Sequence, residues 1–162
     1  LTIPRTGHTT CYDDGNSVTP FSITSGQDGN YQRGSAWPSP RFMDNGNGTV
    51  TDRLTGLMWQ QNGGAFLNWQ NALNYCNTLT TGGYSDWRLP NINELSSLVH
   101  YGQSDPAAWL NSQGFTGIQD FYWSASTYSN DAKGGMKVGM SLGRIGSTDK
   151  VSQNYVIAVR GG

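Results

Sequence analysis

Two segments of the chain carry apolar residues at helical spacing, and strand-like segments lie on both sides of them. In the first, Asn68 is a cap residue before a stripe of Trp69, Ala72, Leu73, Cys76 and Leu79. In the second, Asn91 and Glu94 form a capping box at the start of the helix. A buried stripe of Leu95, Leu98 and Val99 follows it. This order is not a βαβ repeat, so it predicts an α+β domain with two helices packed on one face of an antiparallel sheet.

The expected strands are short. Segments 41–44 and 49–52 surround Asn45-Gly46-Asn47-Gly48, whose residues tolerate positive φ, and this pattern predicts a β-hairpin. Segment 55–59 predicts a further strand. The C-terminal third alternates apolar and small or polar residues, which predicts antiparallel strands at 121–125, 136–142 and 155–160.

The remaining segments lack a period. Residues 1–40 are rich in Gly, Thr, Ser and Pro, and we expect an irregular N-terminal arm packed on a domain formed by residues 41–162. Residues 100–120 are expected to form a long connection with one helical turn near 107–110. A length of 162 residues fits a single domain overall.

Composition narrows the function. The net charge is -1 and 13% of residues are charged, so the clustered Lys and Arg of a general nucleic-acid binder are missing. The sequence has no apolar run of about 18 residues, the length that a membrane-spanning helix needs. The neutral polar composition is typical of secreted domains, and a chain that begins at Leu1 is what removal of a signal peptide would leave, as would an expression fragment. We therefore expect export to the cell surface, the medium or the periplasm.

The sequence nominates no catalytic chemistry. It has two histidines, no G-x-S-x-G elbow, no phosphate-binding glycine loop and no paired zinc-ligand spacing. We expect a protein that is not an enzyme and needs no cofactor, with one open question. Calcium accepts the oxygen ligands that Asp44, Asn47 and Asp52 offer, although the turn-forming interpretation of the same residues is favoured.

Other polar residues have structural interpretations. Asp86-Trp87-Arg88 is expected to form a buried ion pair beside a packed ring rather than a ligand site. Cys11 and Cys76 are compatible with one disulfide in an oxidising compartment or with two unpaired thiols, and the sequence leaves both alternatives open.

Candidate ligand-binding residues lie in the irregular segments 100–120 and 127–154. Aromatic rings there can stack on a ligand, Asn130 and Asp131 can hydrogen-bond to it, and the cations can pair with anions. The predicted face consists of Tyr101, Trp109, Tyr128, Asn130, Asp131, Lys133 and Arg144.

Several ordered motifs resemble one bacterial domain family of uncharacterised function, which includes the C-terminal domain of Lcl-type collagen-like adhesins. The motifs span nearly the whole chain, from Thr10-Cys11-Tyr12-Asp13 in the arm to the C-terminus. They include Asp44 to Asp52, Thr55-Gly56-Leu57-Met58-Trp59, Trp87-Arg88-Leu89-Pro90-Asn91, Tyr122-Trp123-Ser124-Ala125-Ser126 and Tyr155 to Gly162. Trp87 to Pro90 is also similar to a motif of formylglycine-generating enzymes, but the late cysteine pair of those enzymes is missing.

The resemblance implies a C-type-lectin-like fold, export, and attachment to glycans or matrix without catalysis. It also implies disulfides that this chain lacks, because members commonly carry a second arm cysteine and a last-strand cysteine where this chain has Ala158. Cys11 and Cys76 have therefore each lost the partner that the family pattern gives them. The calcium-binding and sugar-binding motifs of animal C-type lectins are missing as well.

Two functions follow as expectations. The first is a secreted or cell-surface binding and adhesion module that recognises a glycan or a surface protein. The second is a structural subunit of an extracellular filament or other assembly, in which homo-oligomer neighbours pack against the arm.

Overall fold

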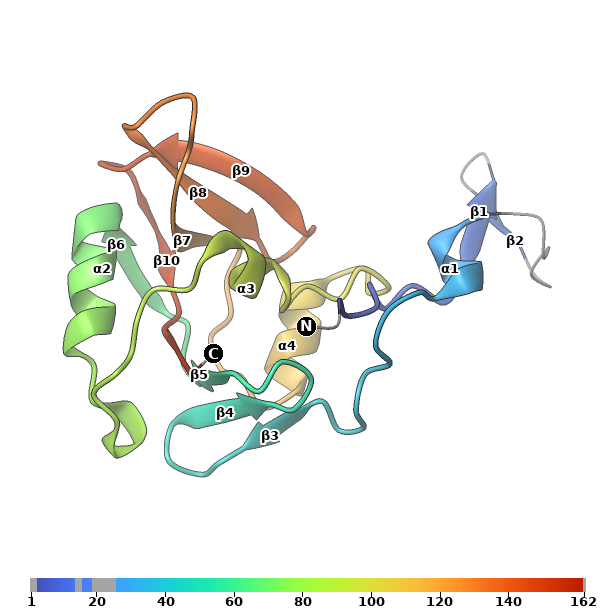
Figure 1. Ribbon diagram of the computed structural model, residues 1–162, viewed down its shortest axis with the longest axis horizontal. Helices are drawn as coiled ribbons and strands as arrows, with labels where there is room; N and C mark the ends of the chain where they lie inside the picture. The colour runs from blue at the N-terminus through green and yellow to red at the C-terminus, as the bar shows by residue number, and fades with distance from the viewer. Residues whose placement is uncertain (1–2, 14–15, 19–25, 162) are drawn as a thin grey trace.

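The described residues have an α+β architecture with two larger sheets and a two-stranded sheet in the N-terminal arm (Figure 1). The structure, a computed structural model, describes residues 3–13, 16–18 and 26–161. The larger sheet has the order β6-β10-β7-β8-β9, and its strands are β6 (Ala65–Asn68), β7 (Phe121–Thr127), β8 (Gly134–Gly139), β9 (Arg144–Asp149) and β10 (Gln153–Val156). The smaller has the order β11-β5-β4-β3, with β3 (Phe42–Asp44), β4 (Thr49–Asp52), β5 (Met58–Gln60) and β11 (Val159–Arg160). The arrangement is consistent with a C-type-lectin-like fold.

The predicted hairpin is confirmed. Strands β3 and β4 pair antiparallel, with Phe42 opposite Asp52. Gly46 and Gly48 in the connecting turn have φ values of 71° and 81°, a region that glycine enters without steric cost.

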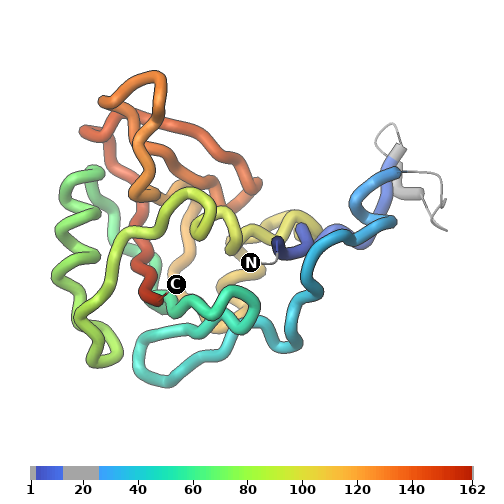
Figure 2. Tube along the Cα trace, in the orientation of Figure 1, coloured from blue at the N-terminus to red at the C-terminus, as the bar shows by residue number. Residues whose placement is uncertain are grey.

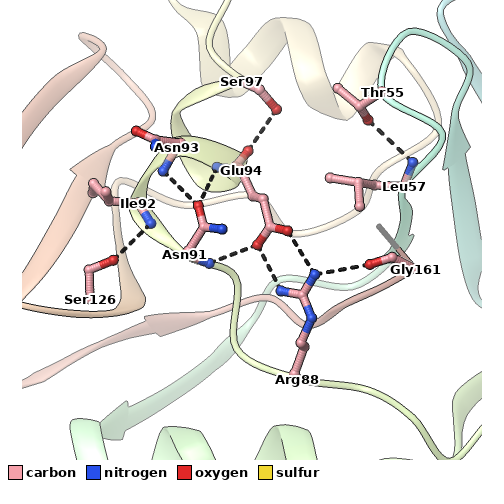
Figure 3. A network of polar contacts seen from close by, with 10 residues as sticks. All are labelled: Thr55, Leu57, Arg88, Asn91, Ile92, Asn93, Glu94, Ser97, Ser126 and Gly161. Carbon is pink, nitrogen blue, oxygen red and sulfur yellow. Dashed lines mark hydrogen bonds and ion pairs between the residues drawn. The ribbon is translucent and has the colours of Figure 1, made fainter. Parts of the chain in front are cut away.

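Both predicted helices are present. Helix α2 (Trp69–Thr78) begins at Asn68, whose side chain accepts a hydrogen bond from the Asn71 N–H. A 3-10 turn, η1 (Thr81–Gly83), follows it. Helix α3 (Ile92–Ser96) has the expected capping box: Asn91 Oδ1 accepts from the backbone of Glu94, and the Glu94 carboxylate accepts from the Asn91 N–H (Figure 3).

The structure departs from the expected strands in several ways. Strand β6 was not predicted, and the strand expected at 155–160 is divided between β10 and β11, which belong to different sheets. Strand β9 was not predicted, because Arg144 to Asp149 alternates little in hydrophobicity. Strand β10 pairs parallel with β7, so the larger sheet is not purely antiparallel. Strand β8 ends at Gly139, and Leu142 is 60% exposed in the turn beyond it.

The core lies on both faces of the larger sheet. Tyr122 and Trp123 are adjacent on β7 and fully buried, and they belong to different apolar clusters because successive strand residues point to opposite faces. The Trp123 cluster includes Cys76 of α2. The Tyr122 cluster includes Leu95 of α3, residues of the smaller sheet and helix α4 (Pro106–Ser112), which is longer than the single turn expected. Helices α2 and α3 therefore pack on opposite faces of the larger sheet, not on the one face expected.

The arm has two parts. Strands β1 (Cys11–Asp13) and β2 (Asn16–Val18) and helix α1 (Asp28–Tyr31) lie away from both sheets, at one end of the molecule (Figure 2). The segments on either side of them return to the domain, where Trp37 packs on His100 and the Tyr101 N–H donates to Thr6 O. Among the described residues, no helix combines the length and apolar character needed to cross a bilayer.

Candidate functional site

A polar cleft lies where the arm meets the loop between α3 and α4. Its volume is about 390 Å³, and its walls are formed by His8, Thr9, Thr10, Tyr12, Tyr101, Gly102, Gln103 and Ser104. Tyr12 is 51% exposed and Tyr101 is 39% exposed, so each offers part of its ring to a ligand. Only His8 among these side chains can carry a charge near neutral pH. The cleft thus combines ring faces with uncharged hydrogen-bonding groups.

Backbone contacts hold the two walls together. The Tyr101 N–H donates to Thr6 O at 3.0 Å, which joins the loop to the arm. At the next residue the backbones of the loop and of the arm approach so closely that a Cβ on Gly102 would lie 2.3 Å from Gly7 O. Only glycine fits there without displacing backbone.

Tyr101 is held in place at its far end. Its hydroxyl donates to Gly143 O at 3.3 Å, and a Cβ on Gly143 would lie 2.6 Å from the Tyr101 ring. The ring therefore leans on the turn between β8 and β9 and leaves its remaining surface to the cleft. A fixed aromatic ring beside hydroxyls and amides suits the apolar face and polar rim of a sugar.

A second surface lies in the loop between β7 and β8. Four of the predicted residues meet there: the Asn130 amide donates to the Tyr128 hydroxyl at 3.3 Å, and the Lys133 N–H donates to Asp131 Oδ1 at 3.0 Å. Lys150 was not predicted to belong here. Its ammonium donates to Thr127 Oγ1 and Ala132 O and lies 4.1 Å from the Trp69 ring centroid.

The other predicted ligand residues lie elsewhere. Trp109 is on α4 and packs against Phe42, Trp37 and His100, so its role is in the core. Arg144 begins β9, at the end of the larger sheet near Tyr101. The seven residues therefore do not form one continuous face.

The three candidate calcium ligands have other partners. Asp52 is fully buried, and its carboxylate accepts from Arg41, from the Leu54 N–H and from the Thr55 hydroxyl. Asp44 accepts from the Gly46 N–H and from Gln61, and Asn47 accepts from Thr49. No group of three or more His, Cys, Asp or Glu side chains gathers among the described residues. Each of the three side chains thus has a structural role in the hairpin or in its contacts with flanking residues.

The cysteines are not bridged to each other. Cys11 lies in β1 and Cys76 in α2, at opposite ends of the molecule (Figure 1). Both side chains are buried. Burial raises the pKa of the Cys76 thiol to about 12.

The expected Asp86–Arg88 ion pair is corrected by the structure. Asp86 pairs with Arg160 at 2.7 Å, and Arg88 forms two hydrogen bonds of 2.7 Å to Glu94. Figure 3 shows Arg88 also donating to Gly161 O, so this side chain joins α3 to the C-terminus. The Trp87 side chain, which lies between Asp86 and Arg88 in the sequence, is buried as expected.

Comparison with known proteins gives one clear match. The family model described as the Lcl C-terminal domain matches residues 48–160. No curated protein matches the chain. The matched segment contains both sheets apart from β3, together with α2, α3 and α4, and it excludes the arm wall of the cleft. Because the match covers well over half of the sequence, this chain belongs to the Lcl C-terminal domain family.

Proposed function

We propose that this domain is a secreted or cell-surface, non-catalytic binding module that recognises a glycan in the cleft between the arm and residues 101–104. The observation that carries the proposal is the cleft itself, which places two partly exposed tyrosine rings among hydroxyl and amide groups. Such walls bind a sugar by ring stacking and hydrogen bonds. Family membership and the weakly charged composition support export and adhesion.

The charge of the cleft narrows the glycan class. Its walls have no lysine, arginine or carboxylate, so an amino sugar finds no charge partner there and a sulfated sugar could pair only with His8. The net charge of -1 adds little long-range attraction for a polyanion. The preferred ligand is therefore an uncharged oligosaccharide.

The direct test is a glycan array that carries neutral and anionic oligosaccharides, probed with the full chain. Tyr101→Ala removes one of the two tyrosine rings of the cleft. Tyr128→Ala is the matched control, since Tyr128 is 36% exposed on the other candidate surface. The proposal expects binding to neutral glycans that Tyr101→Ala loses and Tyr128→Ala keeps. Loss in Tyr128→Ala alone would move the site to the loop between β7 and β8, and a chelator arm tests calcium.

One observation favours assembly as a second function. Strand β9 lies at the edge of the larger sheet, and exposed apolar side chains accompany it: Leu142 at 60%, Ile145 at 53% and Val151 at 84% exposure. Open edge strands with apolar side chains are templates for pairing with another chain. Sedimentation of the purified chain tests this alternative, which requires discrete oligomers that Ile145→Lys disperses.

A further inference from the structure

The His100 side chain occupies the point where the arm docks. Its ring lies 4.6 Å from Trp37 of the arm and 4.7 Å from Trp109 of α4, both in edge-to-face geometry. Trp37 is itself held by a hydrogen bond of 3.0 Å from its indole N–H to Arg5 O. His100 therefore fills the space between the arm and the domain core.

The other segment of the arm, which contains Gly7, also contacts the imidazole ring of His100. Gly7 has a φ of 89°, and a Cβ at that position would lie 2.4 Å from His100 Nδ1. The backbone of the arm can approach the imidazole only because residue 7 is glycine. The neighbouring residue His8 lines the cleft. A change at His100 is thus transmitted directly to one wall of the cleft.

The hydrogen bonding of His100 requires a neutral ring. Its Nδ1 accepts a hydrogen bond of 3.1 Å from the Gly102 N–H, and an imidazolium has no lone pair with which to accept it. The charged or titratable groups that face the ring are Arg41 and His8. Both groups disfavour a positive charge on the His100 ring.

The electrostatic surroundings agree with this geometry. Burial, together with Arg41 and His8, lowers the pKa of His100 below its ordinary value, although a backbone hydrogen bond acts in the opposite direction. A histidine with a lowered pKa in the docked state stabilises that state at neutral pH. As the pH falls below the ordinary histidine pKa of about 6.5, the undocked state binds more protons and docking weakens.

We propose that His100 is a pH-sensitive latch: its neutral ring holds the arm on the domain and keeps the cleft assembled, and its protonation releases the arm. The consequence for ligand binding rests on the proposed function, because the arm supplies His8, Thr9, Thr10 and Tyr12 to the cleft. The latch itself concerns the docking of the arm and exists without a ligand.

The test follows arm docking by NMR in the ligand-free chain between about pH 8 and pH 5, the range in which histidine titrates. The indole N–H of Trp37 and the amide N–H of Tyr101 both donate across the docking contact, so their exchange protection reports it. The latch predicts that both N–H groups lose exchange protection together as the pH falls. The midpoint pH of this loss should equal the midpoint pH at which the His100 ring titrates. Protection that persists to pH 5, or that follows His8 instead, overturns the proposal.

Two variants sharpen the test. His100→Asn keeps an acceptor near the Nδ1 position and cannot be protonated, so it should hold the arm at both ends of the pH range. His8→Gln is the control and should retain the transition. A transition that survives in His100→Asn contradicts the latch. Because no ligand is present, failure of the latch and failure of glycan recognition are separate results.

Discussion

Arg41 and Asp52 form a buried, two-pronged ion pair across the base of the β3–β4 hairpin. The Nε–Oδ1 and Nη2–Oδ2 distances are 3.0 and 2.8 Å, and the two side chains are 2% and 0% exposed. Arg41 also donates to Ser97 O just beyond α3 and lies 4.5 Å from the Trp37 ring centroid. One guanidinium therefore connects the β3–β4 hairpin, α3 and the arm.

Removing the charge of Asp52 should destabilise the fold strongly. In Asp52→Asn the guanidinium of Arg41 stays buried without its counter-charge, which costs about 3–5 kcal/mol. Urea denaturation followed by tryptophan fluorescence measures the loss. Asp86→Asn is the control, because Asp86 pairs with Arg160 at the surface, and it should change stability little. Equal losses in the two variants would contradict the assigned importance of burial.

The capping box of α3 should contribute measurably to stability. Asn91→Ala leaves the N–H groups of Asn93 and Glu94 without their side-chain acceptor, and the expected cost is about 1 kcal/mol. The same denaturation experiment measures it. Asn74→Ala, in the middle of α2 and outside any cap, is the control and should be neutral or slightly stabilising.

Glu94 should make stability depend on acid. Burial raises its pKa, but hydrogen bonds from Arg88 and from the Asn91 backbone outweigh it, so the pKa lies below its ordinary value of 4.5. The contribution is complete above that ordinary pKa and is lost as the pH falls below it, because the unfolded chain then binds the proton first. Glu94→Gln should flatten this part of the stability profile. An unchanged slope would show that other carboxylates dominate it.

The Cys76 thiol should resist alkylation in the folded protein. The thiolate is the reactive form, and burial raises the pKa of this fully buried group to about 12. Peptide mass spectrometry after iodoacetamide treatment at neutral pH should find Cys76 unmodified in native protein and modified in denaturant. Equal modification in both conditions would mean that α2 does not bury Cys76 against the larger sheet.

Local signals explain which parts of the fold the sequence predicts. The hairpin, α2 and α3 each rest on residues a few positions apart, such as Asn91 and Glu94, and all three are confirmed. Strand β9 lacks such a signal and forms because six residues of β8 pair with it. Pairing with β8, and not a local sequence signal, therefore makes this segment a strand.

The candidate site was only partly accessible from the sequence. Tyr101 was predicted, but its opposite wall comes from residues 8–12, and no local pattern indicates that these segments meet. Trp109 was expected on the surface because it lies in a segment without a sustained period. It turns inward on α4, where Ala107 and Leu110 are also buried.

The most direct test of the account is the affinity of the Tyr101→Ala and Tyr128→Ala chains for the neutral oligosaccharide that binds best on the array, measured by titration calorimetry. The account predicts about tenfold weaker binding for Tyr101→Ala, the effect of losing one ring contact, and unchanged binding for Tyr128→Ala. Wild-type affinity in Tyr101→Ala, or no neutral glycan bound by the full chain, would contradict it.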